Sequence, residues 1–251
     1  MSTGKEILFY DIASAPPVTT FAPNPSKTRY ALNFKGVNYR TEWTKLPKVA
    51  ETRKRLGTPP NRTHMDGSPF YTLPVIHDLS TGAIVGDTFD IAVYLDETYP
   101  DTGPRLIPAE SIGTLAAFNI QIDALFTNNV LLCVSGFPFD PETAEESKTE
   151  MARRVGRERW EELLPAEEDR PKMMEAFEAS LAGLVKIFRR RDEGPFLEGA
   201  QATYADMIIG GWLRWTNKTV KKEEWEKIAA WHGGLWGNLF NGLEERYTEM
   251  K

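Results

Sequence analysis

The pattern of the chain changes near residue 100, and this change constrains the fold more than any other feature of the sequence. Before it, short apolar runs rich in β-formers alternate with segments of helical spacing. After it, long segments of helical spacing follow one another, without the alternation of a half-buried strand. We therefore predict an α/β unit joined to an all-helical unit, with the junction near Asp101–Ala109.

The α/β unit is predicted to have the order β-α-β-(α)-β-β-α. It begins with a strand at Glu6–Ile12, an amphipathic helix at Ser26–Phe34 that ends at Gly36, and a strand at Val37–Leu46. A hairpin of Tyr71–Asp78 and Ala83–Asp87 follows, and then a helix that begins at Asp87 or Thr88 and ends before Pro100. The helical unit is predicted to hold helical stretches at Ser111–Val134, Glu142–Leu164, Arg170–Arg191, Tyr204–Thr216 and Trp225–Tyr247, the last with one or two helices.

The composition excludes several classes of protein. The 251 residues are 41% hydrophobic, which suffices for a buried core, and the net charge of −6 gives no basic surface for nucleic acid. No apolar run approaches the roughly 20 residues of a membrane span, and the charged N-terminus does not have the pattern of a signal peptide.

The cysteine and histidine content points to a reducing compartment and away from metals. Cys133 is the only cysteine, so a disulfide framework within the chain is excluded, and we predict a buried core thiol. Three scattered histidines argue against a metal site. We therefore expect a cytoplasmic globular protein without a metal.

Leu73-Pro74 interrupts a segment that otherwise has the pattern of a strand. Proline removes a donor from the hydrogen-bond ladder, so it indicates an edge strand or a cis peptide bond at the start of the strand. From the residues alone an ordinary edge-strand proline is favoured, because few X-Pro bonds are cis. A cis bond would instead turn the backbone N–H and C=O of Leu73 outward, where a peptide-like ligand could pair with them.

Two polar pairs stand at the starts of predicted helices. Asp87-Thr88 is either a plain N-cap or a site for an α-amino acid, whose carboxylate suits the helix N-terminus and whose ammonium suits the acidic side chain. Thr203 and Asp206 have capping-box spacing before an apolar helix, and we interpret them as structural.

The segment FAPNPSKTRYALNFKG, residues 21–36, has the composition of a loop that turns into a helix. Such a junction often holds a nucleophile or an anion, because free N–H groups meet the positive end of the helix dipole. Ala22 stands where a hydroxyl or a thiol would be most useful. The segment is therefore either a site that lacks its reactive side chain or only the first helix.

Together and in this order, these features resemble the cytosolic glutathione transferases over essentially the whole chain. The segment PNPSKTRYALNFKGVNYRTEW is most similar to the fungal classes related to bacterial β-etherases, in particular the fungus-specific class A. The resemblance implies an α/β plus all-α fold, with an N-terminal thioredoxin-like domain (residues 1–100), an all-helical C-terminal domain (residues 110–251) and a homodimer.

The resemblance also implies a site for glutathione as the co-substrate. Leu73, before a cis Pro74, would pair through its backbone with the cysteinyl part, and Asp87 and Thr88 would hold the γ-glutamyl end. The start of the first helix, Ala22–Ser26, would face the sulfur, with Pro23 beside it.

Two further parts of the site are harder to assign. The candidates for the glycyl carboxylate are Lys45 and His64, although a histidine in so turn-rich a loop is otherwise expected at the surface. The helical half would supply an apolar pocket for a second substrate. Its candidate residues are Phe21, Phe118, Ile122, Leu125, Phe126, Asn129 and Trp215, with plain core packing as the alternative.

Ala22 departs from the serine and cysteine classes of the family, in which the reactive residue precedes the proline that is here Pro23. Without that residue we expect no mixed disulfide with glutathione and no thiol-transferase activity. Conjugation requires only donors that lower the pKa of the glutathione thiol. Asn24 with backbone amides is the first candidate and Ser26 the second, although Ser26 is equally well explained as a helix-cap hydroxyl.

Two functions follow from the resemblance. The first is an enzyme that conjugates glutathione to aromatic electrophiles, or reduces peroxides, in the detoxification of plant or wood-derived phenolics. The second is a ligandin-like protein that binds polyphenols with little catalysis, which Ala22 favours. The intact Leu73-Pro74 and Asp87-Thr88 features place the enzyme first.

Overall fold

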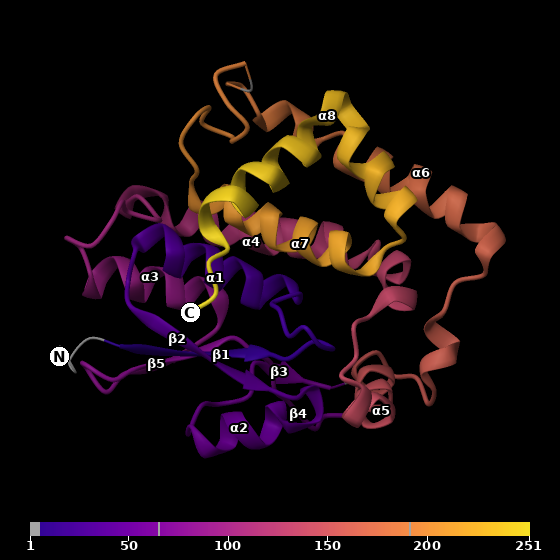
Figure 1. Cartoon of the computed structure of the whole chain (residues 1–251), viewed down its shortest axis with the longest axis horizontal. Coiled ribbons are helices and arrows are strands. Elements are labelled where there is room, and N and C mark those ends of the chain that lie inside the picture. The colour runs from indigo at the N-terminus through magenta and orange to yellow at the C-terminus, as the bar shows by residue number, and fades with distance from the viewer. Residues whose placement is uncertain (1–5, 65, 191) are drawn as a thin grey trace.

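A mixed four-stranded sheet forms the centre of the first half of the chain (Figure 1). Its strands are β1 (Ile7–Ile12), β2 (Tyr39–Thr44), β5 (Val75–Asp78) and β6 (Ile84–Gly86). They lie in the order β2-β1-β5-β6, with β1 parallel to β2 and antiparallel to β5. Helices cover both faces, which is why β1 is a continuous buried run rather than an alternating one. This is the thioredoxin-like arrangement that the resemblance implies.

The computed structural model describes residues 6–64, 66–190 and 192–251. Residues 1–5, Met65 and Arg191 lie outside it. These belong to the predicted N-terminal segment, to the turn-rich loop around His64 and to the end of the third predicted helical stretch.

Three helices pack on this sheet. Helices α1 (Pro23–Lys35) and α3 (Thr88–Thr98) lie between the sheet and the helical half, and α2 (Val49–Arg55) lies on the opposite face (Figure 1). Helix α1 begins three residues earlier than predicted, because a proline at the first helical position needs no N–H partner. It ends as predicted at Gly36, whose φ of 67° is the left-handed conformation that glycine favours.

Two features of this half differ from the prediction. A two-stranded ribbon, β3 (Arg62–Thr63) and β4 (Pro69–Phe70), follows α2 and was not predicted. The edge-strand interpretation of Pro74 is wrong, because β5 is an interior strand between β1 and β6. The Leu73-Pro74 bond is cis and precedes the first ladder pair, so the proline costs no strand hydrogen bond.

The second half of the chain is helical, as the change of pattern near residue 100 predicts. Its helices are α4 (Ile112–Thr127), α5 (Ala144–Arg154), α6 (Arg170–Leu181), α7 (Tyr204–Thr219) and α8 (Lys222–Tyr247). Short 3-10 turns occur at Leu46–Lys48 in the first half and at Ala109–Ser111, Val130–Gly136, Pro141–Thr143, Trp160–Leu163, Glu167–Asp169 and Leu184–Ile187 in the second.

Several predicted helical stretches are broken. The first bends by 62° between α4 and the turn at Val130–Gly136, and over the described residues no single helix is long and apolar enough to cross a membrane. Only that bent pair reaches the length and composition, taken together. Helix α8 is interrupted at Trp231–Gly234, where His232 and two glycines have positive φ, so the last stretch holds two helical segments.

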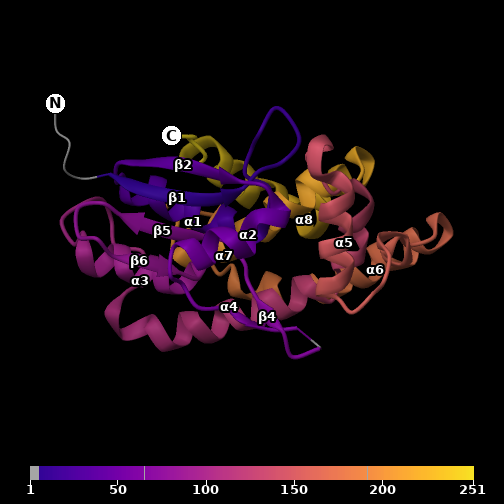
Figure 2. The same cartoon turned by 90° about the horizontal axis from the view of Figure 1, so that it is seen from below.

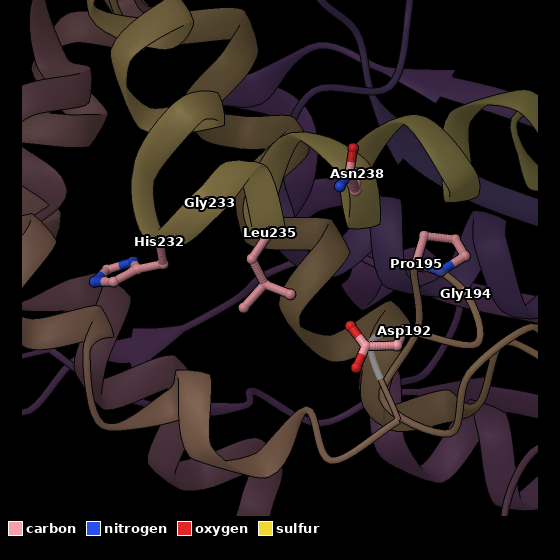
Figure 3. A pocket seen from close by; sticks show the side chains of 7 residues that line it. All are labelled: Asp192, Gly194, Pro195, His232, Gly233, Leu235 and Asn238. Carbon is pink, nitrogen blue, oxygen red and sulfur yellow. The ribbon is translucent and has the colours of Figure 1, made fainter.

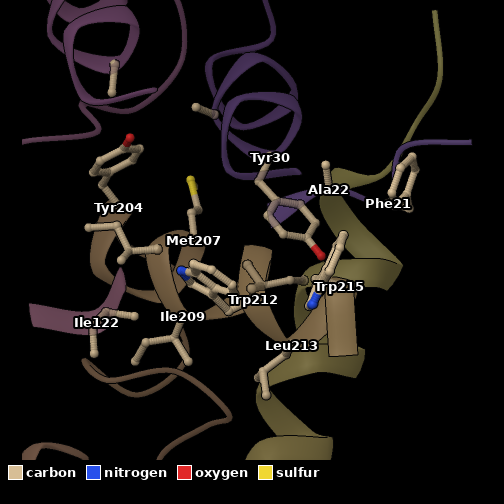
Figure 4. Close-up of a cluster of buried hydrophobic side chains, with 14 of the residues drawn as sticks. Phe21, Ala22, Tyr30, Ile122, Tyr204, Met207, Ile209, Trp212, Leu213 and Trp215 are labelled. Atoms are coloured by element: carbon tan, nitrogen blue, oxygen red, sulfur yellow. The ribbon is translucent and has the colours of Figure 1, made fainter. Parts of the chain in front are cut away.

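Helix α7 is the centre of the helical half. Every residue from Tyr204 to Thr216 is buried, and side chains of α1, α4 and α7 gather in one core (Figure 4). A Cβ atom on Gly211 would lie 2.5 Å from the carbonyl oxygen of Pro23. Glycine at this position therefore allows the first turn of α1 to rest directly on α7.

Helix α1 is not the amphipathic surface helix that its sequence suggests. Lys27, Arg29 and Lys35 are all buried. Each pairs with an aspartate of a different element: Lys27 with Asp123 of α4 at 2.5 Å, Arg29 with Asp11 of β1 at 3.2 Å, and Lys35 with Asp96 of α3 at 3.2 Å. The basic side chains can be buried because each has an acidic partner on a neighbouring element.

The Thr203 and Asp206 pair is structural, as predicted. The buried Asp206 carboxylate accepts hydrogen bonds from the N–H and the hydroxyl of Thr203, both at 2.7 Å, and from the N–H of Leu197 at 2.8 Å. Burial raises the pKa of Asp206 to about 6, although these hydrogen bonds act in the opposite direction.

This pKa makes the stability contribution of Asp206 depend on pH. Because the folded-state pKa lies above the ordinary 3.8, the folded protein retains a proton that the unfolded chain has released between about pH 4 and pH 6. The free energy of unfolding should therefore fall as pH rises through this window, by about 3 kcal/mol from this group.

The comparison that isolates this effect is the wild type against Asp206→Asn, with urea unfolding followed from pH 4 to pH 7. The difference in unfolding free energy, wild type minus variant, should shrink as pH rises and level off above about pH 6. A difference that is constant over this range would show that the carboxyl titrates normally.

Candidate active site

A cavity of about 270 Å³ opens where the first turn of α1 meets the helical half. From the first half it is lined by Ile12, Phe21, Ala22, Pro23, Asn24, Pro25, Leu46, Arg62, Phe70, Thr72 and Leu73. From the helical half it is lined by Thr127, Val130, Leu131, Val134, Phe137, Met151, Arg154, Val155, Trp160, Leu163, Trp212 and Trp215. The structure thus brings the predicted sulfur-facing segment and Leu73 to one mostly apolar cavity.

The first turn of α1 offers fewer donors than its sequence position suggests. Pro23 and Pro25 have no N–H, and the N–H of Ser26 donates to the Ala22 carbonyl at 3.0 Å. In the described chain, the backbone N–H groups of Ala22 and Asn24 and the side-chain amide of Asn24 have no hydrogen-bond partner. The free donors at this helix end therefore come from Ala22 and Asn24.

Ser26 does not line the cavity. Its side chain is buried, and its hydroxyl donates to the Ala22 carbonyl at 2.8 Å. This is the helix-cap alternative considered for Ser26: the hydroxyl is used within the first turn and does not point at a ligand.

Leu73 offers its backbone to the cavity. Its N–H and C=O make no hydrogen bond to any residue of the described ranges, and the antiparallel ladder of β5 starts only at Val75. Next to it, the carbonyl of Thr72 accepts from Nη1 of Arg53 at 2.8 Å. The free backbone of Leu73 is what a pairing with a peptide-like ligand requires.

Asp87 and Thr88 open helix α3, as predicted, but they lie outside the cavity lining. Asp87 is the exposed N-cap, and its Oδ1 accepts from the N–H of Phe89 at 3.3 Å. Thr88 is buried, and its carbonyl accepts from the hydroxyl of Tyr204 at 2.9 Å. The Asp87 carboxylate is therefore accessible at the positive end of the helix dipole.

Arg53 is a buried residue that sequence reasoning missed. Its guanidinium donates to Thr58, Asn61 and two backbone carbonyls, and it lies against Gly86, next to Asp87. Burial lowers the pKa of Arg53, and the charge of Asp87 counteracts this. The residue ties the segment before Leu73 to the start of α3; nothing in the spacing of α2 indicates this role.

The two candidates for a glycyl carboxylate do not line the cavity. Lys45 pairs with Glu142 and, at 3.2 Å, with Asp140, so it joins the two halves of the chain. His64 is buried rather than on the surface, because its Nε2 lies 2.8 Å from Nη2 of Arg153 and its ring packs on Phe70. Burial and the charge of Arg153 lower the pKa of His64.

The candidates for the apolar pocket divide into two groups. Phe21 and Trp215 line the cavity, with their rings stacked at 5.9 Å. The α4 candidates lie in the core or along the helix away from the lining: Phe118, Ile122, Leu125, Phe126 and Asn129. The chain bends after α4, so only the last residue of this helix, Thr127, lines the cavity, and the next lining residues come from the turn at Val130–Gly136.

Phe21 and Trp215 belong to an aromatic wall of the cavity, together with Phe137 and Trp160, which sequence reasoning missed. The Phe137 ring lies 5.3 Å from Phe21 and 5.1 Å from Trp215, and it also packs on Trp160 at 5.8 Å. The signal in the sequence was the segment GFPF, which is too aromatic for an exposed loop. Such a wall suits a flat aromatic ligand.

A second hollow of about 340 Å³ lies away from this cavity (Figure 3). His232, Leu235 and Asn238 reach it from α8, and Asp192 and Pro195 from the loop before α7. It contains none of the predicted site residues. In the part of the chain that the structure describes, no group of three or more His, Cys, Asp or Glu side chains could hold a metal.

Cys133 is buried, as predicted, and burial raises the pKa of its thiol to about 11. It lies outside the cavity lining. A thiol in this state is protonated at neutral pH and is a poor nucleophile.

Comparison with known proteins agrees with this geometry. Residues 21–98 match the glutathione S-transferase N-terminal domain, and residues 139–247 match the glutathione S-transferase C-terminal domain. A glutathione S-transferase-like protein, ustS, of Aspergillus flavus is 32% identical over 90% of this chain and 89% of its own length.

Two solved fungal structures are similar over nearly the whole chain. A glutathione S-transferase of Ceriporiopsis subvermispora, solved in complex with glutathione, has a TM-score of 0.85 and 34% identity over 98% of each chain. A glutathione transferase of Phanerochaete chrysosporium has a TM-score of 0.82 and 32% identity over 98% of this chain and 99% of its own. These matches confirm the resemblance to fungal glutathione transferases and make glutathione the co-substrate. The chain belongs to the glutathione S-transferase family.

Proposed function

We propose that this protein conjugates glutathione to hydrophobic, aromatic electrophiles. The observation that carries the proposal is the position of free donors from Ala22 and Asn24 at the edge of an aromatic cavity. A thiolate held there would lie beside the space in which an apolar electrophile binds. Catalysis would then consist of thiol activation and of holding the two substrates together.

We assign glutathione to the surface from Leu73 to the start of α3. The free backbone N–H and C=O of Leu73 support pairing with the cysteinyl part, and the exposed Asp87 carboxylate supports binding of the γ-glutamyl ammonium. Thr88 adds the helix N-terminus for the γ-glutamyl carboxylate. For the glycyl carboxylate, Lys45 and His64 stay candidates; the Lys45 side chain is 38% exposed.

Asn24 is the residue we assign to thiol activation. It supplies a side-chain amide and a backbone N–H at a helix end where two of the first residues are prolines. A hydrogen bond to a charged group contributes about 1.5–3 kcal/mol, which corresponds to a thiol pKa lowered by about one to two units. Ala22 contributes its N–H and leaves room for the sulfur.

This arrangement supports conjugation and peroxide reduction over thiol transfer. The nucleophile in conjugation is the thiolate of glutathione, so no reactive side chain of the protein is required. Thiol transfer needs a protein thiol at the site, and Ala22 cannot provide one. The aromatic wall of Phe21, Phe137 and Trp215 supports phenolic and other flat electrophiles from plants or wood as substrates in detoxification. The buried, reduced Cys133 supports a reducing compartment such as the cytoplasm.

A ligandin-like function is the second candidate. The same aromatic wall could hold polyphenols without reaction, and the alanine at position 22 favours this ligandin-like function. Stabilisation by flavonoids or lignans in a thermal shift assay, without turnover of any electrophile or hydroperoxide, would support this alternative against the enzyme.

A homodimer is supported by the outer face of α4, which runs along one edge of the molecule (Figure 2). Gly113, Ala117, Ile120 and Ala124 are exposed and recur at helical spacing on one face. Ile120 is 70% exposed, which is unusual for a large apolar side chain on a helix. We propose that this face is part of the interface between two copies of the chain.

The role of Asn24 can be separated from that of Ser26. In Asn24→Ala, kcat/KM with a chromogenic aryl halide should fall roughly tenfold to hundredfold, and its pH profile should shift upward by about one to two units, because the thiolate loses a donor. Ser26→Ala is the matched control: its activity should stay within roughly twofold, since the lost hydrogen bond lies within the helix. Equal losses in both variants would contradict the assignment.

One substitution should introduce the thiol-transferase activity that we expect the wild type to lack. Ala22→Cys, incubated with oxidised glutathione, should form a mixed disulfide detectable by mass spectrometry, because its thiolate attacks the disulfide and releases one molecule of reduced glutathione. The variant should also gain thiol-transferase activity, since the cysteine thiol would stand at the helix N-terminus that lowers its pKa. Ala22→Ser serves as the control with a hydroxyl in the same place. Thiol-transferase activity in the wild type would refute the argument from Ala22.

The proposed interface can be tested by light scattering after size-exclusion chromatography. Ile120→Lys should shift the protein from dimer toward monomer, because it places a charge in an apolar contact. Leu79→Lys is the matched control, because Leu79 is also an exposed large apolar side chain but lies outside α4, so this variant should leave the dimer intact. A wild type that is monomeric, or an Ile120→Lys variant that stays fully dimeric, would rule out this face.

A further inference from the structure

The two charged side chains that line the cavity are both arginines. Arg62 reaches it from the β3–β4 ribbon of the first half, and Arg154 from the end of α5 in the helical half. Their guanidinium carbons lie 4.2 Å and 5.1 Å from the centre of the Phe70 ring, which also lines the cavity. Two positive groups thus meet at one aromatic ring, with no acidic side chain among the lining residues described.

The hydrogen-bonding capacity of this pair is largely unused. Arg62 has no hydrogen-bond or ion-pair partner within the described residues. Arg154 donates through Nε to Glu150 at 3.0 Å and through Nη2 to the carbonyl of Tyr71 at 3.4 Å, which leaves Nη1 without a partner in the described chain. By contrast, every nitrogen of the Arg53 guanidinium has a partner.

The surroundings of Arg154 strengthen the case for an anion. Its side chain is only 12% exposed and stands in an apolar wall between Met151 and Val155. Burial lowers the pKa of Arg154; the Glu150 carboxylate counteracts this, and the positive charges of Arg153 and Arg62 act in the same direction as burial. Arg62 is exposed, so an anion could reach the pair from solvent, and a negative group between the two arginines would relieve their repulsion.

We propose that Arg62 and Arg154 bind a carboxylate of the second substrate, so that the enzyme selects aromatic electrophiles that carry an acid group. A guanidinium matches a carboxylate through two parallel N–H bonds, and Phe70 adds an aromatic contact for the ring of the substrate. The inference rests on the proposed function, since it names the substrate class of the same cavity.

The position of the pair favours the second substrate over glutathione as the source of the carboxylate. Glutathione is assigned to the surface from Leu73 to the start of α3. Arg154 instead belongs to the part of the cavity lining that the helical half supplies, with Met151, Trp160 and Leu163. A flat electrophile that packs on this wall would place a ring substituent at the guanidinium pair.

The test compares 4-chloro-3-nitrobenzoate with 4-chloro-3-nitrobenzamide, which differ only in the charge of one substituent. In Arg62→Gln, kcat/KM for the benzoate should fall roughly tenfold to hundredfold while that for the benzamide changes less than roughly threefold. The loss should appear mainly in KM, because the carboxylate is remote from the reacting carbon. Arg55→Gln, an exposed residue of α2 outside the cavity, is the control.

Arg154→Gln should show the same selectivity, and circular dichroism would report any loss of fold caused by removing its bonds to α5 and Tyr71. If Arg154→Gln loses its fold, the conclusion rests on Arg62→Gln, because the Arg62 side chain contacts the Phe70 ring but makes no hydrogen bond or ion pair in the described chain.

Calorimetric binding of 1-naphthoate and 1-naphthamide, which do not react, separates this inference from the proposed function. Preferential binding of the naphthoate that is lost in Arg62→Gln supports the carboxylate site, even if no electrophile is turned over and the enzymatic proposal fails. If Arg62→Gln affected the acid and the amide of each ligand pair equally, the proposed carboxylate site would be overturned. It would also be overturned by a loss of affinity in Arg62→Gln for glutathione but not for its glycyl ethyl ester, since the arginines would then bind glutathione itself.

Discussion

The site depends on the contact between helices α1 and α7. The first turn of α1 rests on Gly211, where any side chain would collide with the Pro23 carbonyl. Three ion pairs then hold the rest of α1, through Lys27, Arg29 and Lys35, and those of Arg29 and Lys35 are buried on both sides. Buried ion pairs contribute little net stability, but removing one partner leaves a costly unpaired charge, so together they permit one orientation of the helix.

The orientation of α1 determines which donors reach the cavity. With the first turn fixed on α7, Ala22 and Asn24 line the cavity together with Leu73, and their N–H groups have no partner in the described chain, while the Ser26 hydroxyl bonds within its own helix. Two prolines reduce the donors at this helix end. Position 22 thus holds an alanine beside free amide donors, and the proposed binding of a substrate thiolate rests on this arrangement.

The cavity is made where the two halves of the chain meet, and its specificity is a property of that junction. Phe21 and Arg62 come from the first half, and Phe137, Arg154 and Trp215 from the second. No local pattern could have joined them, because their separation in the sequence is long and their contacts form only on folding. Sequence reasoning therefore named Phe21 and Trp215, which line the cavity, but missed Phe137 and Arg154. Its other candidates for the apolar pocket lie on α4 or just after it, outside the lining.

The residues themselves determined what depends on local geometry: the Gly36 cap, the Thr203 and Asp206 box, and the order of strands and helices that identified the family. The tertiary structure alone decided which polar side chains are buried and which remain free. His64 is buried with Arg153 against it, and among the described residues the Arg62 guanidinium has no hydrogen-bond or ion-pair partner. Local patterns follow from backbone chemistry over a few residues, whereas burial and pairing of charge depend on partners that only the folded chain brings together.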